Sequence, residues 1–137
     1  MLKKKFLIKK RHNHYLGPSF SNKDIKKILF KYKNKISFRL SQNIYVEIAR
    51  LINLEKIIGW FQGHSEFGPR ALGNRSILCK AYPSNMKDYL NKQVKFREYF
   101  RPFAPAVLLE NSKEFFKLDQ ESAHMLIASQ IKLNKKK

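Results

Sequence analysis

The sequence contains a single cysteine, Cys79, among 137 residues. One thiol forms neither an internal disulfide nor a cysteine-based zinc cage, so both kinds of cross-link are excluded. The chain also lacks a run of about twenty apolar residues, which excludes a membrane-spanning helix. The apolar patch at 6–8 is too short for the core of a signal peptide, and we expect a cytoplasmic protein. The length leaves room for one domain.

Acidic residues are scarce, since 10 Asp and Glu stand against 29 Lys and Arg, a net charge of +19. A charge of this size is typical of nucleic-acid-binding proteins. Most of it lies in the flanks, because residues 1–40 hold thirteen basic residues and one acid, and residues 132–137 hold four lysines. The arginines are distributed differently, because four of the seven lie between Arg70 and Arg101. The flanks therefore indicate solvated arms, and the arginine cluster indicates a site in the middle of the chain.

Glycine is scarce too, yet three of the five glycines fall in one stretch, residues 63–76, which reads GHSEFGPRALGNRS. Glycine lets a backbone approach a ligand closely, and proline stiffens a turn. Arginine supplies a planar donor fork that fits phosphate or carboxylate. This composition between apolar runs favours an anion-binding loop over a simple connector.

Apolar periodicity predicts an α/β domain in which strands alternate with helices. Ser21 and Asp24 have the spacing of a capping box, and Ser41 and Ser84 are further N-cap candidates. Residues 15–19 are expected to form a turn. The expected helices cover about 22–31, 41–54, 85–95 and 111–116. The expected strands cover 56–61, 75–79, 106–109 and 125–128.

The histidines do not have the spacing of a metal site. His12 and His14 lie one residue apart in the basic arm, with no third ligand near them. His64 is expected to be exposed, and His124 is expected at the edge of a strand. Cys79 is expected to be a small buried apolar residue.

Three runs resemble the C-terminal domain of the O-carbamoyltransferases, a family that includes nodulation-factor and antibiotic-tailoring enzymes. They are 59–63 (GWFQG), 66–78 (EFGPRALGNRSIL) and 95–105 (KFREYFRPFAP). Residues 15–19 also resemble the segment that leads into that domain. The resemblance covers roughly residues 15–128, and the two central runs are long and ungapped.

The resemblance implies a partial YrdC-like α/β domain with a mixed twisted sheet, preceded by a basic helical lead-in. The corresponding divisions are a basic irregular arm at 1–14, the lead-in at 15–54, the partial domain at 55–129 and a Lys-rich tail at 130–137. In the family this domain makes carbamoyladenylate from carbamoyl phosphate and ATP, and carbamoyl then passes to a substrate hydroxyl. Mg²⁺ is compatible with such ligands. The resemblance places an iron ion in a separate N-terminal transfer domain.

By resemblance, Arg70, Lys95 and Arg101 are the candidate catalytic residues and contact the phosphate-bearing ligands. We expect the three to converge on one anion site. A structural arginine that pairs with Glu66 or Glu98 is the alternative for Arg70. Further candidates for ligand binding, each of which has a structural alternative, are Asn74, Arg75, Ser76 and Arg97. For Asn74 and Ser76, the alternative is that local hydrogen bonds tie down the turn.

The sequence departs from the family in extent and at His64-Ser65, where Arg-Met is common. It has no room for the transfer domain and stops midway through the C-terminal domain. We expect a truncated gene, a remnant or one piece of a split enzyme, inactive alone, whose partners are small phosphates and the missing parts as separate chains. The alternative is a basic module that binds nucleic acid without enzymatic activity. Trimming residues 1–14 and 132–137 is expected to remove most nucleic-acid binding and to leave phosphate binding nearly intact, whereas retained RNA binding would favour the alternative.

Overall fold

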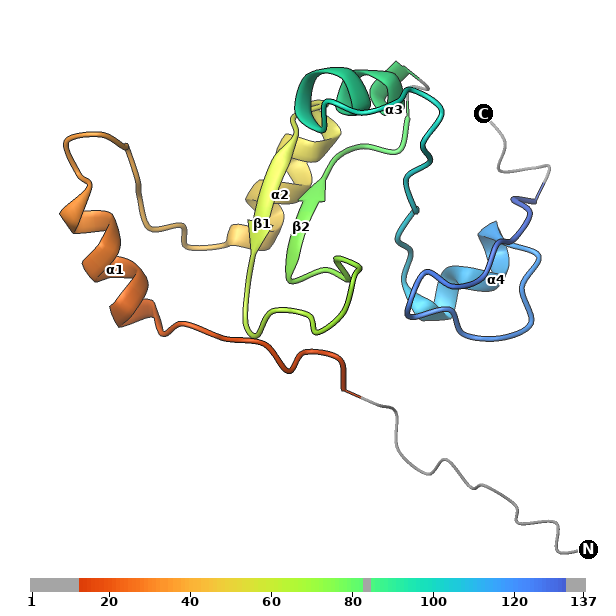
Figure 1. Cartoon of the computed structure of the whole chain (residues 1–137), viewed down its shortest axis with the longest axis horizontal. Helices are drawn as coiled ribbons and strands as arrows, with labels where there is room; N and C mark the ends of the chain where they lie inside the picture. The colour runs from red at the N-terminus through yellow and green to blue at the C-terminus, as the bar shows by residue number, and fades with distance from the viewer. Residues whose placement is uncertain (1–12, 83–84, 133–137) are drawn as a thin grey trace, which may run out of the picture.

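The computed structural model describes residues 13–82 and 85–132. Two helices, α1 (Asn22–Lys31) and α2 (Ile44–Asn53), precede the strands β1 (Ile58–Phe61) and β2 (Arg75–Leu78). Helix α3 (Asn85–Tyr89) continues directly into a π-helical turn, Leu90–Val94. A 3₁₀ turn, Leu109–Asn111, leads into α4 (Ser112–Phe115). The described chain is thus a mixture of helix and strand, as the sequence predicts (Figure 1).

The centre of the fold is the antiparallel hairpin of β1 and β2, in which Ile58 pairs with Leu78 and Phe61 with Arg75. Both strands lie where the apolar runs predict them. Helix α2 contacts β1, with the rings of Tyr45 and Trp60 6.2 Å apart. The long connection at 62–74 leaves the hairpin at its lower end in Figure 1. This connection contains the glycine-rich sequence.

Local capping explains the first two helices. The Ser21 side chain accepts from the backbone N–H of Asp24, whose carboxylate accepts from the N–H of Ser21, so the predicted capping box is confirmed. The predicted cap at Ser41 is wrong, because Asn43 accepts from the N–H of Val46 and α2 begins after it. Ser41 instead donates to the carboxylate of Glu47 at 2.9 Å. The cap predicted at Ser84 lies outside the described residues.

Two predicted strands, 106–109 and 125–128, do not form, and the described sheet has two strands. A short apolar run becomes a strand only when another strand pairs with it, and none lies beside 106–109 in the described chain. Met125 has a φ of 56°, which breaks an extended conformation. His124 is therefore not at a strand edge. Instead, Phe116 and Ile131 form an isolated bridge that ties the end of α4 to residues near 131.

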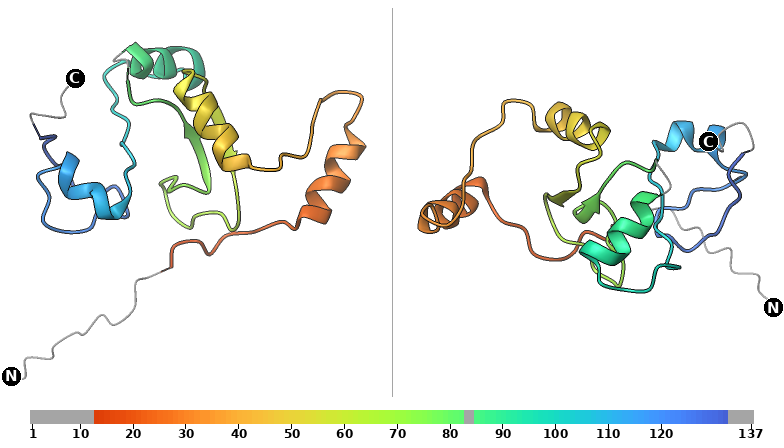
Figure 2. Two further views of the ribbon diagram at one scale, coloured as in Figure 1. Left: turned by 180° about the vertical axis from the view of Figure 1, so that it is seen from behind. Right: turned by 90° about the horizontal axis from the view of Figure 1, so that it is seen from above.

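Very few side chains of the described residues are buried. Leu90 is the one buried hydrophobic residue and Asn91 the one buried polar residue among the described residues. Tyr89, which precedes them in the chain, remains 55% exposed. Helix α1 contains no buried residue and stands away from the hairpin in both views of Figure 2. In the described part of the chain, no helix has the length and apolarity needed to cross a bilayer.

Candidate functional site

The glycine-rich loop at 62–74 joins the two strands and adopts a conformation that depends on glycine. Gly68 has a φ of 132° and Gly73 a φ of 110°, values that residues with a side chain rarely adopt. These two positions let the chain reverse direction on either side of Pro69 and Arg70. The glycines are therefore conformational, and they place Arg70 on an exposed turn.

The Glu66 carboxylate organises this loop. Its Oε1 accepts backbone N–H groups from Leu72 at 2.7 Å, Asn74 at 2.8 Å and Arg75 at 3.2 Å. Burial raises the pKa of Glu66, but the backbone donors outweigh it and bring the pKa from 4.5 down to about 2. The carboxylate thus stays ionised and neutralises three N–H dipoles that face one point. The alternative pairing of Arg70 with Glu66 is wrong.

The Arg75 guanidinium is bound by backbone carbonyls and by an aromatic ring of the protein. Its Nη1 donates to the carbonyls of Gln62 at 2.6 Å and Asn74 at 3.0 Å, and its Nη2 to those of Gly63 at 3.0 Å and Pro18 at 3.2 Å. The guanidinium carbon lies 3.5 Å from the centre of the Phe61 ring. A cation on an aromatic face with its donors paired has little left to offer a ligand. This geometry supports the structural alternative for Arg75.

Asn74 at the end of the loop and Ser76 in β2 are half-buried and bond to loop residues. Asn74 Nδ2 donates to the His64 carbonyl at 2.7 Å, and its Oδ1 accepts from Gln62 Nε2 at 3.1 Å. The Ser76 hydroxyl accepts from the N–H of Gly73 at 3.0 Å. These are the hydrogen bonds of a tied turn, the alternative that sequence reasoning leaves open.

Arg70 differs from its neighbours. Its side chain is exposed and makes no hydrogen bond or ion pair with any described residue. The guanidinium therefore keeps its full set of donors while the surrounding polar groups are satisfied within the loop. Lys95, at the end of the π-helical turn, is also exposed and has no side-chain partner in the described chain.

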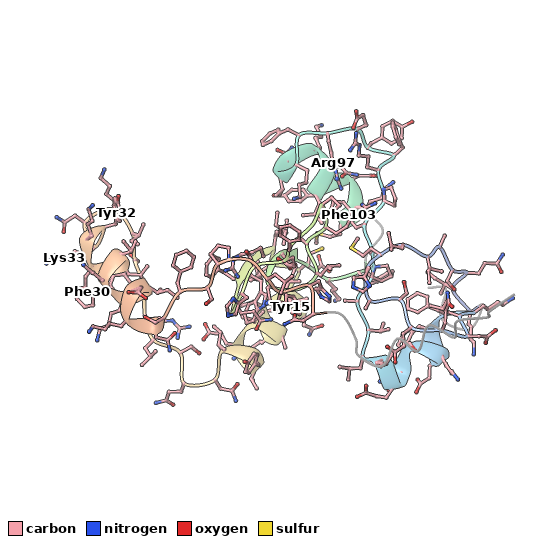
Figure 3. The ribbon with its side chains drawn as sticks, turned by 60° about the horizontal axis from the view of Figure 1, so that its bottom comes forward. Tyr15, Phe30, Tyr32, Lys33, Arg97 and Phe103 are labelled. Carbon is pink, nitrogen blue, oxygen red and sulfur yellow. The ribbon has the colours of Figure 1, made fainter. Side chains whose placement is uncertain are left out.

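The second motif is built around Asn91, which is fully buried and which sequence reasoning missed. Its Nδ2 donates to the carbonyls of Tyr99 at 3.1 Å and Arg101 at 3.0 Å, and its Oδ1 accepts from Arg97 Nε at 2.8 Å. Arg97 also lies over Phe103, 4.7 Å from the ring centre, as Figure 3 shows. Arg97 is thus another internally bound arginine. No local pattern marks Asn91, because its partners lie six to ten residues further along the chain.

Arg101 pairs with Glu98, with Nε and Oε2 2.8 Å apart on the surface. The pKa of Glu98 is lowered first by its own backbone N–H and then by the Arg101 charge. Glu98 is therefore the partner of Arg101 rather than of Arg70. Both side chains of this pair remain 53% exposed.

The described structure does not bring the three candidate cations together. The loop at 62–74 lies at the lower end of the hairpin in Figure 1, whereas residues 90–101 lie at its upper end. Within the described ranges, no hydrogen bond or ion pair joins the two segments. Convergence of Arg70 with Lys95 and Arg101 stays a prediction that needs a movement of one segment or a bridging ligand.

Tyr15 and His14, near the start of the described chain, make contacts that the sequence does not predict. The Tyr15 hydroxyl donates to the Leu72 carbonyl at 2.9 Å, so a residue from the predicted turn reaches the glycine-rich loop. The His14 ring packs against Tyr15 and His124, with centroids 4.2 and 4.9 Å away. Both His14 ring nitrogens are buried without a hydrogen-bond partner among the described residues. His12 lies outside them.

No group of three or more His, Cys, Asp or Glu side chains suited to a metal forms within the described ranges. Cys79 is half-buried rather than fully buried, and burial raises the pKa of its thiol. The cations that the described residues leave unengaged in the two motifs are the exposed side chains of Arg70 and Lys95.

Residues 49–137 match the family described as carbamoyltransferase C-terminus. The chain belongs to this family. The match covers the hairpin, the glycine-rich loop and the second motif, so the resemblance carried by these runs is confirmed. The geometry described above is thus that of a carbamoyltransferase C-terminal segment.

The chain is also similar to individual proteins, one of which is named as a carbamoyltransferase. An uncharacterised protein of Synechocystis sp. is 39% identical over 120 residues, 86% of this chain and 20% of that protein. Nodulation protein NolNO of Sinorhizobium fredii is 45% identical over 105 residues, 76% of this chain and 15% of that protein. The 3'-hydroxymethylcephem-O-carbamoyltransferase of Streptomyces clavuligerus is 48% identical over 71 residues, 52% of this chain and 13% of that enzyme. The chain therefore spans a fifth or less of the length of these relatives, and their names give no support to the nucleic-acid alternative.

Proposed function

We propose that this chain is the phosphate-binding part of an O-carbamoyltransferase, with carbamoyl phosphate and ATP as its ligands. The observation that carries the proposal is the contrast between Arg70 and Arg75. The Arg75 side chain donates hydrogen bonds to four backbone carbonyls. The Arg70 side chain, five residues earlier, donates none to the described residues. An arginine that a rigid loop presents to solvent without a partner is suited to an incoming anion.

The chemistry of the ligands fits such a group. Carbamoyl phosphate and the triphosphate of ATP are both polyanions, and a guanidinium binds two phosphate oxygens at once without losing its proton. Fixed positive charge also stabilises the charge that moves during phosphoryl and adenylyl transfer. In this proposal Arg70 holds a phosphate, and the loop around it keeps the guanidinium oriented. Mg²⁺ would accompany the nucleotide.

Lys95 and Arg101 are proposed as a second group of phosphate ligands. Lys95 has no described side-chain partner, and a phosphate would compete with Glu98 for Arg101. A pair that is exposed on both sides costs little to break, because surface ion pairs contribute about 0–1 kcal/mol. The exchange of one anion for another at Arg101 is thus energetically undemanding.

Formation of carbamoyladenylate and transfer of carbamoyl to a hydroxyl are implied for proteins several times longer than this chain, so in the proposal they depend on the remainder of such a protein. Any iron chemistry belongs to that remainder in the proposal. The acceptor hydroxyl would likewise be chosen there.

Arg70→Ala is expected to weaken the binding of carbamoyl phosphate by about 1.5–3 kcal/mol, the range for a hydrogen bond to a charged group. Isothermal titration calorimetry of both chains with carbamoyl phosphate, and separately with ATP, measures the change. Arg50→Ala is the matched control, because Arg50 is also exposed but lies on α2, outside both motifs. Equal affinity of the wild-type and Arg70→Ala chains would refute the assignment.

A further inference from the structure

The segment Asn13–Pro18, which we call the strap, lies directly against the glycine-rich loop. The N–H of Phe67 donates to the His14 carbonyl at 2.7 Å, and the N–H of Ser65 donates to the Pro18 carbonyl at 3.0 Å. In return, the N–H of Gly17 donates to the Ser65 carbonyl at 2.9 Å. Figure 1 shows the strap passing beneath the lower end of the hairpin. The backbone that leads to Arg70 is therefore bonded on one side to a segment nearly fifty residues earlier.

Side chains strengthen the same contact from both sides. Tyr15 donates its hydroxyl to the Leu72 carbonyl at 2.9 Å, and Arg75 reaches the Pro18 carbonyl at 3.2 Å. His64 Nδ1 lies 2.9 Å from the Gly17 carbonyl. The strap thus touches the loop before Arg70, through His64 to Phe67, and after it, through Leu72 and Arg75. A segment held at both ends has less freedom than one held by its own hydrogen bonds alone.

Gly17 makes this approach possible. A Cβ at position 17 would lie 2.0 Å from Ser65 Oγ, 3.1 Å from Ser65 Cβ and 3.0 Å from the Ser65 carbonyl oxygen. The hydroxyl could rotate away, but the Cβ and the carbonyl belong to the part of the loop that the strap binds. The backbone of Gly17 does not itself require glycine, because its φ lies outside the left-handed region. Gly17 is therefore needed for close contact rather than for a special conformation.

We propose that the strap is a positioning element of the anion-binding loop and that Gly17 is its positioning residue. The inference rests on the proposed function, since it assigns the strap a role in phosphate binding at Arg70. The strap fixes Ser65 and Phe67, and through them the turn at Gly68 on which Arg70 is carried. His14 belongs to the strap, so a truncation that spares phosphate binding ends at residue 12 rather than residue 14.

Gly17→Ala in the full chain tests the proposal, with Gly59→Ala as the matched control. Gly59 lies in β1, and a Cβ there would meet nothing within 4 Å. We expect Gly17→Ala to speed hydrogen exchange of the Ser65 and Phe67 amides roughly tenfold or more, because two backbone hydrogen bonds of ordinary strength are lost. We expect a similar loss of affinity for carbamoyl phosphate. Gly59→Ala should change neither quantity.

A second substitution separates positioning from general destabilisation. Ser65→Gly removes Oγ and Cβ, which would lie 2.0 and 3.1 Å from the added methyl group, and leaves the carbonyl oxygen at 3.0 Å. The Gly17→Ala/Ser65→Gly chain should therefore recover part of the slow exchange and of the affinity. Unchanged exchange in Gly17→Ala, or the absence of rescue, overturns the proposal. Faster exchange with unchanged affinity overturns the role in binding. If the wild-type chain binds no carbamoyl phosphate, both the proposed function and the role of the strap in binding are refuted. The hydrogen-exchange rates of Ser65 and Phe67 still show whether the strap holds the loop.

Discussion

Glu66 is the residue on which the shape of the glycine-rich loop depends most, because three backbone N–H groups converge on its carboxylate. Its pKa falls from 4.5 to about 2 in the folded chain, so its stabilising effect is complete above pH 4.5 and is lost as the pH falls toward 2. We expect Glu66→Gln to lower the free energy of unfolding by about 1 kcal/mol at pH 7, the difference between charged and neutral acceptors. The difference in unfolding free energy between wild type and Glu66→Gln should become smaller below pH 4.5. Urea denaturation at a series of pH values measures it. Glu114→Gln, which alters an exposed carboxylate on α4, is the control. Parallel pH profiles for Glu66→Gln and the wild type would contradict the assigned role.

Among the helices, α1 depends on local interactions, because none of its residues is buried and it stands apart from the hairpin. An isolated helix of ten residues is marginal in water, so its capping box matters more than it would for a packed helix. We expect Ser21→Ala to destabilise α1 by about 1 kcal/mol and to reduce its helix content, while the hairpin stays intact. Backbone chemical shifts over 22–31 and over 58–61 measure the two effects separately. Ser37→Ala, in the loop after α1, replaces a serine that caps nothing. A helix content unaffected by Ser21→Ala would mean that contacts other than the cap hold α1.

For the whole molecule, the decisive property is how much apolar surface remains uncovered. Leu90 is the one buried hydrophobic residue of the described chain, whereas Leu40 is 95% exposed and Leu126 is 80% exposed. Exposed apolar surface on this scale favours association with other polypeptide. We expect the purified chain to form concentration-dependent assemblies in gel filtration and to release little or no pyrophosphate from ATP and carbamoyl phosphate. Repeating the gel filtration at high salt is the control, because hydrophobic assemblies persist there whereas complexes with nucleic acid dissociate. A monodisperse monomer that releases pyrophosphate at an enzyme-like rate would contradict this expectation.

The sequence by itself determined the parts of this protein that depend on near neighbours. The helix at 22–31, the strands around Trp60 and Ile77 and the glycine-rich loop follow from caps, apolar spacing and glycine, which act over a few residues. The family could be read from the same local runs.

Only the tertiary structure decided what depends on distant partners. The apolar runs at 106–109 and 125–128 read as strands, but strand formation requires a second strand that the described chain does not place beside them. Arg70 in the loop and Arg75 at the start of β2 are the same residue type, five positions apart. Arg75 is structural because carbonyls from the strap and from the loop meet around it, and sequence spacing cannot show that meeting. The same holds for Gly17, whose need for glycine arises from a Ser65 that approaches it in space rather than along the chain.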